Sequence, residues 1–396
     1  MAPIPRLKTY DGPVILSYGF RPFFLAGAIA AILGIAAWIP QYFGQIVLPN
    51  ILPPPAWHAH EMLFGFIPAV ITGFLLTAIP NWTGRLPLQG RPLLFLLLVW
   101  LAGRLAIGLS AMIGWLPSML IDCSYLLLLG LVIAREIIAG KNWRNLKVLA
   151  IVGLLFVADV AFHLEAHYTG AAQYSERAGV AAIVMLVILI GGRVVPSFTR
   201  NWLSRENPGR LPAPADRFDE ALVTSAAIAA TSWILSPDSI LSAALLLIAA
   251  GAQVIRLARW VGWRAWRDPL VLVMHGAYVF VPIGFALNAC AALRPEFAQP
   301  SAGIHAWTIG ATSGMILAIM TRATLGHTGR ALKATRATVV IYVAVAISAV
   351  ARVGAALEAQ RSTELLYLAA AGWIVAFAGF AAIYGPFLTS GRRKSP

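Results

Sequence analysis

The chain has few charged residues for its length. Lys, Arg, Asp and Glu make up 12% of the 396 residues, whereas 59% are hydrophobic. The mean hydropathy is +0.78. A soluble globular domain carries about 25% charged residues, so this composition excludes that class. The chain is expected to lie in a lipid bilayer.

Cysteine is also scarce. The two cysteines, Cys123 and Cys290, both fall inside apolar segments and lie far apart in sequence. This usage argues against a disulfide framework and against a cysteine-based metal site. The N-terminal residues 1–17 lack the short apolar region and cleavage site of a secretory signal, so we expect no segment to be removed.

Apolar runs long enough to cross a hydrocarbon core of about 30 Å recur along the whole chain. Because lipid satisfies no backbone hydrogen bonds, each run is predicted to be a helix. The predicted spans are 19–39, 59–79, 93–113, 118–138, 147–167, 178–198, 220–236, 239–258, 269–292, 303–323, 337–357 and 365–386. The predicted fold class is therefore an all-α integral membrane protein with about twelve transmembrane helices.

Acidic residues are scarcer than basic ones, and the formal charge is +14. A basic excess can indicate nucleic-acid binding, but in a membrane protein it is first a topology signal. Twenty-five of the 30 basic residues fall on one side of the predicted helices. The positive-inside rule then places both termini in the cytoplasm, and we expect membrane lipid but no nucleic acid as a partner.

No polar stretch is long enough to form a soluble domain. The longest, residues 201–219, is rich in proline and arginine and joins the sixth and seventh spans. Such a composition is typical of a linker. We predict a single polytopic membrane domain over residues 1–396, with 201–219 as a cytoplasmic linker.

A short pattern recurs in two spans. His60 and His305 each stand 23 residues before the last threonine of a helix, at Thr-Gly-Arg 83–85 and 328–330. About 23 helical residues reach roughly 35 Å, so each segment can carry histidine at the outer mouth and Thr-Gly-Arg at the inner one. With a looser echo at 196–200, the pattern suggests three related units of four helices, unless these short matches are chance.

Five of the seven histidines are predicted at the outer ends of helices, which favours a site in the outer third of the membrane. They are His58, His60, His163, His167 and His305. Within the fifth span, Asp159, His163 and His167 are spaced four residues apart and stack along one helical face. Imidazoles one turn apart can share a metal, so we interpret this face as metal-binding or proton-handling. The alternative is ordinary hydrogen bonding near a helix end.

His58 and His60 are two residues apart and point in different directions on a regular helix. Either one of them lies in the loop, or they serve different partners. His58 and Glu61 share a face, so Glu61 can orient His58; otherwise the cluster is a solvated cap, with Glu61 in the first helical turn. The order His-Ala-His-Glu is not the His-Glu-x-x-His of zinc proteases, so peptidase activity is not expected.

Arg104 lies near the middle of the third span, where an unpaired guanidinium is costly. Asp159 is predicted at a similar depth, so an ion pair between them is the simplest account. The alternative is that Arg104, or Arg352 and Arg361 near the outer end of the eleventh span, holds an acidic group of a bound cofactor.

Four longer motifs run in order along nearly the whole chain. They are Gly-Phe-Arg-Pro-Phe-Phe at 19–24, Trp-His-Ala-His-Glu-Met at 57–62, Pro-Asn-Trp-Thr-Gly-Arg at 80–85 and Met-Thr-Arg-Ala-Thr-Leu-Gly-His-Thr-Gly-Arg at 320–330. Together they resemble the NnrS family. The resemblance implies a bacterial inner-membrane protein of about twelve helices that contains haem and copper and serves in denitrification and relief of nitric-oxide stress. It implies no particular reaction and no ligand assignment.

A haem needs axial ligands at matching depth, and His58, His60 and His305 are predicted there. Haem-copper oxidases and nitric oxide reductases also draw haem histidines from their second and tenth helices, in a twelve-helix arrangement of three units. Their high-spin haem and copper site is not visible here, because the sixth and seventh spans contain no histidine. The architecture is expected to resemble theirs while the active centre differs.

Our first hypothesis is a haem and copper protein that acts on or binds nitric oxide in the outer half of the inner membrane. A b-type haem is expected on His305 and on His60 or His58, with His60 preferred and with Arg104, Arg352 or Arg361 beside it. The copper is expected on His163 and His167 with Asp159, near His58 and Glu61, since imidazole suits copper. Whether the protein is an oxidoreductase, a sensor or a sink for nitric oxide stays open, as does its redox partner.

The second hypothesis is a transporter, or a protein that delivers metal or haem to respiratory denitrification enzymes. Transport predicts a polar path through the bilayer, for which Arg104, Asp159 and His275 are candidates. Catalysis predicts a closed haem pocket confined to the outer half.

Overall fold

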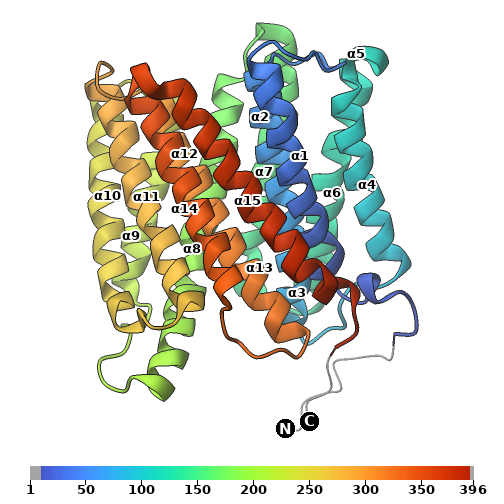
Figure 1. Ribbon diagram of the computed structural model, residues 1–396, viewed down its shortest axis with the longest axis vertical. Coiled ribbons are helices and arrows are strands. Elements are labelled where there is room, and N and C mark those ends of the chain that lie inside the picture. Colours follow the sequence, from blue (N-terminus) through green and yellow to red (C-terminus); the bar gives the residue numbers. More distant parts are fainter. Residues whose placement is uncertain (1–9, 393–396) are drawn as a thin grey trace. The chain divides into compact units, whose positions relative to one another are not determined.

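The computed structural model describes residues 10–392. These residues form helices joined by short connections, and no strand occurs among them (Figure 1). Twelve of the helices are long and apolar enough to cross a bilayer, which confirms the predicted fold class and the predicted number of spans. The chain ends, which are predicted in the cytoplasm, include residues 1–9 and 393–396 outside the described part, so their side of the membrane stays a prediction.

The α-helices, in chain order, are α1 (Phe20–Tyr42), α2 (Pro54–His60), α3 (Ile67–Thr83), α4 (Arg91–Gly108), α5 (Ser110–Ile113), α6 (Trp115–Ala139), α7 (Leu146–Thr169), α8 (Gln173–Glu206), α9 (Arg217–Leu235), α10 (Ile240–Arg259), α11 (Pro269–Leu293), α12 (Pro300–His305), α13 (Gly314–His327), α14 (Arg336–Leu357) and α15 (Ser362–Thr389). Two π-helical segments interrupt spans. The segment η2 (Glu61–Phe66) joins α2 to α3, and η5 (Ala306–Ser313) joins α12 to α13. Of the predicted linker 201–219, the first residues continue α8 as far as Glu206.

The chain divides into two compact units. Unit 1 comprises Met1–Gly179, Ala323–Ala331 and Phe380–Pro396, and unit 2 comprises Val180–Arg322 and Leu332–Gly379. Three boundaries fall inside α8, α13 and α15, and the fourth falls in the loop between α13 and α14. The predictions of one polytopic domain and of three repeated four-helix units stay predictions.

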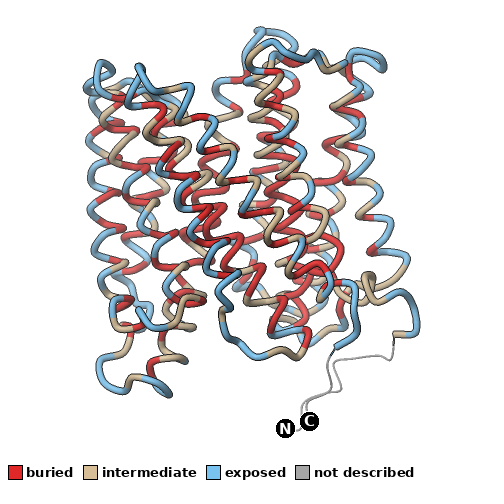
Figure 2. The backbone as a smooth tube through the Cα atoms, in the orientation of Figure 1, coloured by how far each residue is buried: buried red, intermediate tan, exposed pale blue. Residues whose placement is uncertain are grey.

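In unit 1, α1 and α6 pack against α3, and α4 and α7 pack against α6. The span formed by α2, η2 and α3 is the most buried of this unit, whereas α4 is the least buried. Exposed and buried residues alternate along α4, as expected for a helix with one face on lipid (Figure 2). The span formed by α2, η2 and α3 is therefore the one most able to contribute a side chain to a buried site.

The motif at residues 19–24 has a structural role in unit 1. Arg21 is buried, and its Nη1 donates hydrogen bonds to the carbonyl oxygens of Leu388 (2.7 Å) and Ser390 (2.8 Å) at the end of α15. The last carbonyls of a helix lack partners within it, so Arg21 caps α15. The Arg330 guanidinium lies 3.8 Å from the ring centre of Phe387 in the same region.

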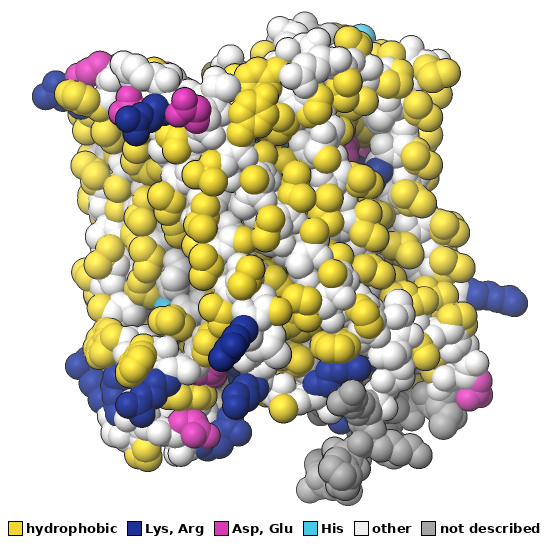
Figure 3. All heavy atoms as spheres, viewed as in Figure 1, with side chains coloured by type: hydrophobic (Ala, Val, Ile, Leu, Met, Phe, Trp, Pro, Cys, Tyr) yellow, Lys and Arg dark blue, Asp and Glu magenta, His cyan; other side chains and the backbone are white. Residues whose placement is uncertain are grey.

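In unit 2, α10 packs between α9 and α11. Arg256 on α10 donates to the carbonyl of Ile188 (2.8 Å) and to the hydroxyl of Tyr278 (2.9 Å), and Tyr278 donates to Gln253 (2.7 Å). Basic side chains gather at the lower ends of α9, α10 and α11 (Figure 3). Because every group in the Arg256 network has a partner, we regard it as a structural network that allows polar side chains inside the span.

Candidate metal centre

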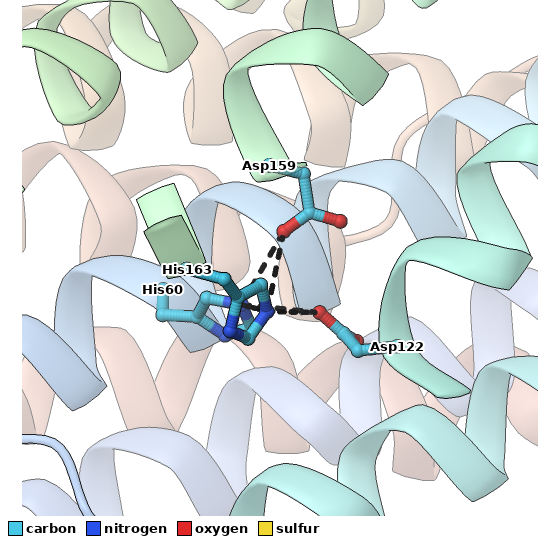
Figure 4. A group of neighbouring side chains, drawn as sticks. All are labelled: His60, Asp122, Asp159 and His163. Atoms are coloured by element: carbon cyan, nitrogen blue, oxygen red, sulfur yellow. Dashed lines mark hydrogen bonds and ion pairs between the residues drawn. The ribbon is translucent and has the colours of Figure 1, made fainter. Parts of the chain in front are cut away.

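Two histidines and two aspartates meet inside unit 1. His60 ends α2, Asp122 lies on α6, and Asp159 and His163 lie on α7 (Figure 4). All four are buried, with exposed fractions between 0% and 6%. Sequence reasoning singled out His60, Asp159 and His163 and overlooked Asp122.

The ligand atoms of these residues face one another. Nε2 of His60 lies 3.2 Å from Nε2 of His163, 3.1 Å from Oδ2 of Asp122 and 3.4 Å from Oδ1 of Asp159. Nε2 of His163 lies 3.3 Å from the same Asp122 oxygen and 3.9 Å from the same Asp159 oxygen. Four N and O ligands at about 2.0–2.1 Å around a tetrahedral ion are separated by about 3.3–3.4 Å. Four of the five separations given above lie within about 0.3 Å of this value, whereas His163 and Asp159 are further apart at 3.9 Å.

The two residues on α7 come together for the reason expected from their spacing. Asp159 and His163 are four residues apart, so they occupy the same face on consecutive turns. Asp122 reaches the cluster because α6 packs against both α3 and α7. A single aspartate in an apolar span is itself a functional signal, and it is the signal by which sequence reasoning could have found Asp122.

His60 is positioned by the helix segment around it. Two prolines, Pro54 and Pro55, open α2 with the backbone angle that a first helical turn needs. The π segment η2 begins directly after His60, and such segments are frequent at functional sites because they widen the turn and free a carbonyl group. The carbonyl of Gly65 in this segment accepts a hydrogen bond from Nε1 of Trp100 (3.0 Å).

Arg104 supports the cluster from α4. Its guanidinium donates to Oε1 of Glu61 (2.7 Å) and forms a second ion pair with Oδ1 of Asp122. The same Glu61 oxygen lies 3.4 Å from Nδ1 of His60. A side chain at Gly65 would occupy the space of this guanidinium. Arg104 and Glu61 thus hold two of the four ligand residues in orientation, as outer partners do in metal sites.

These contacts correct one expectation. Arg104 forms its ion pairs with Asp122 and Glu61 rather than with Asp159. That expectation rested on similar depth alone and took no account of Asp122. Glu61 lies beside the imidazole of His60, and its role in orienting His58 stays a prediction.

The charge of the cluster is consistent with a divalent cation. Two ligand carboxylates carry two negative charges, while Arg104 and Glu61 offset each other. Oδ1 of Asp159 is buried and faces both imidazoles, at 3.4 Å from Nε2 of His60 and 3.9 Å from Nε2 of His163, without a hydrogen bond of good geometry to either. A buried carboxylate oxygen with such weak partners is costly. A metal ion would both satisfy this oxygen and neutralise the site.

The other predicted site residues lie elsewhere. In unit 1, the ring of His58 stacks on Trp38 at 4.2 Å, and the ring of His167 stacks on Trp115 at 3.9 Å. In unit 2, Nδ1 of His305 lies 2.7 Å from the carbonyl of Ser301. Of the two remaining arginines in unit 2, Arg352 on α14 is partly buried and Arg361 is exposed. The structure therefore brings together five of the predicted residues, namely His60, Asp159 and His163 in the cluster with Asp122, and Arg104 and Glu61 around it.

The fold and this cluster define a multi-pass membrane protein with a buried histidine and aspartate group able to hold a metal ion. A comparison with protein families matches residues 14–392 to the model described as NnrS protein. The chain belongs to the NnrS family, as its motifs predicted. A comparison with curated proteins finds no match. Membership of this family suggests a role in the nitric oxide response.

Proposed function

We propose that this protein binds or acts on nitric oxide in the membrane with the help of a copper ion held by His60, Asp122, Asp159 and His163. The observation that supports the metal is the set of four buried ligand atoms, which lie within 4.8 Å of one another. The support for copper and for nitric oxide comes from the family. Copper accepts two imidazoles readily, and with four protein ligands it would bind a small ligand only by taking a fifth one.

The residues around the cluster explain how it would serve a small apolar molecule. The rings of Phe64 and Phe162 pack against His60, with ring centres 5.4 Å and 5.2 Å away. Both phenylalanines are buried. They exclude water from one side of the cluster, while Arg104 and Glu61 close another side. Nitric oxide is small and uncharged, so it crosses such an apolar cover more easily than an ion does.

The depth of burial favours a resident metal over metal delivery. The ligands of a delivery site must exchange their ion with a partner, whereas His60 has no exposed surface. Delivery and transport are the alternative functions. Both would require the ion pair of Arg104 and Glu61 to open so that the ion can leave.

We also propose that His305 carries a b-type haem. The hydrogen bond from its Nδ1 to the Ser301 carbonyl fixes the proton on that nitrogen and makes Nε2 the ligating atom. A π segment follows His305 directly, as one follows His60. Since His60 lies among the metal ligands, we assign it to the metal instead of to haem, and the second axial ligand stays open.

The test is to purify the protein in detergent, measure copper and iron, and record absorption spectra before and after reduction and on addition of nitric oxide. His163→Ala should remove the copper and leave the Soret band, whereas His305→Ala should remove the Soret band and leave the copper. His327→Ala is the control and should change neither. Freshly purified protein without copper, or copper that persists in His163→Ala, would refute the assignment of the cluster.

A further inference from the structure

A second candidate site lies in unit 1, away from the metal cluster. A cavity of about 440 Å³ opens between the end of α3, the following loop and the last turns of α6. Along α6, its lining residue Val132 is ten residues from Asp122, which corresponds to roughly 15 Å. The cavity and the cluster therefore do not share residues or space.

One wall of the cavity is apolar and its rim is charged. Leu76 and Ile79 of α3 and Val132 of α6 belong to the wall, and the loop adds Leu86. Arg85, Arg135 and Glu136 form the rim. A site with this division suits a ligand that has an apolar body and a charged head.

Two hydrogen bonds fix the segments around the cavity, one from the loop after α3 to α6 and one from the residues after α6 to α3. Nε of Arg85 donates to Oε2 of Glu136 (2.5 Å). Nδ2 of Asn142, just after α6, donates to the carbonyl of Trp82 in α3 (2.5 Å). Gly84 adopts a positive φ of 71° and turns the chain into the loop that forms the third wall. The site is therefore largely formed before any ligand binds.

The rim carries one positive charge beyond the Arg85–Glu136 pair. Arg135 is mostly exposed, with 71% of its side chain accessible, and its Nε lies 3.8 Å from Glu136. Both helices end here on the side that the basic residues predict to be cytoplasmic. Anionic lipids attract basic side chains at that membrane surface.

We propose that this cavity binds an anionic phospholipid, with the phosphate at Arg135 and Arg85 and the first part of an acyl chain along Leu76, Ile79 and Val132. The volume lies within the range of about 300–1,000 Å³ that is typical of small-molecule sites. The apolar wall favours a lipid over free phosphate, because a phosphate ion gains nothing from burying that wall.

The experiment uses the full-length protein in nanodiscs made from equal parts of phosphatidylglycerol and phosphatidylcholine, followed by release into detergent and native mass spectrometry of the retained lipid. The wild type should retain phosphatidylglycerol preferentially. Arg135→Gln should reduce this preference about fivefold, which is the effect of one basic side chain at an anionic surface. Val132→Trp, which fills the cavity, should abolish retention.

The matched control is Arg144→Gln, because Arg144 is exposed in the same unit and does not line the cavity; it should behave as the wild type. Arg135 is too exposed for its replacement to prevent folding. Equal retention of the two lipids by the wild type, or an unchanged preference in Arg135→Gln, overturns the proposal. Displacement of the lipid by inorganic phosphate alone also overturns it, because the site would then bind free anions.

Discussion

The replacement His163→Ala tests the metal cluster through the stability of the protein. It removes one of the two nitrogen ligands, the atom that lies 3.2 Å from Nε2 of His60 and 3.3 Å from Oδ2 of Asp122. One imidazole and two carboxylates remain. A site of this kind loses much of its affinity for copper or zinc, which prefer nitrogen ligands.

The expected effect follows from linkage between binding and folding. An ion present at 100 times its dissociation constant stabilises the folded state by about 2.7 kcal/mol. For a unit of roughly 200 residues, 1 kcal/mol shifts the melting temperature by about 2–4 °C. Removing the ion from the wild type should therefore lower the melting temperature by about 5–11 °C. Part of this loss reflects Oδ1 of Asp159, a buried oxygen that loses a positively charged partner when the ion is removed.

The assay is thermal unfolding in detergent, with each variant measured both metal-loaded and after treatment with a chelator. Comparing the two states of one variant removes the effect of the cavity that the alanine creates. In His163→Ala the chelator should shift the melting temperature by less than about 1 °C. His167→Ala, one turn further along α7, should keep the full wild-type shift. The reasoning fails if the chelator has no effect on the wild type, or if it has the same effect on His163→Ala.

Three further replacements test the position of Arg104 beside the metal cluster, the turn after α3 and the cap of α15. Gly65→Ala should displace the guanidinium of Arg104 and lower metal affinity about 10–100-fold, measured by competition with a chromogenic chelator; unchanged affinity contradicts the supporting role. Gly84→Ala should lower the free energy of unfolding by about 1–2 kcal/mol, because the backbone of Gly84 is in the left-handed region. Gly153→Ala, where an added Cβ meets no neighbouring atom, should not lower the stability of the protein. Arg21→Ala should lower the free energy of unfolding by about 2–3 kcal/mol through the lost bonds to three carbonyl groups, and an unchanged melting temperature would show that α15 needs no cap.

The number of spans could be predicted from the sequence because hydrophobic length is a property of each segment alone. The twelve predicted runs correspond to twelve helices, and the errors are at their ends. For example, the span predicted at 178–198 belongs to Gln173–Glu206, because polar residues beyond the bilayer also continue the helix. The π segments after His60 and His305 were not predicted, since no composition or period in the sequence distinguishes them from α-helix.

The candidate site was predicted where it depends on one helix and missed where it depends on packing between helices. The four-residue spacing brought out Asp159 and His163 on one face. The same spacing also favoured His167, but that face drifts with each turn and His167 stacks on Trp115 instead. Asp122 enters through the contact of α6 with its neighbours, which the sequence does not specify. The partners of Arg104 were mistaken for the same reason.

The most direct test of the central claim is X-ray absorption spectroscopy of the purified protein at the copper edge. The proposed ligands predict a shell of four nitrogen and oxygen atoms at about 2.0 Å, with the outer-shell scattering of two imidazoles and with no sulfur. Asp122→Asn should reduce metal occupancy, and the double replacement of His60 and His163 by alanine should remove the signal. A sulfur ligand at about 2.3 Å, or a shell without imidazole, would contradict the account.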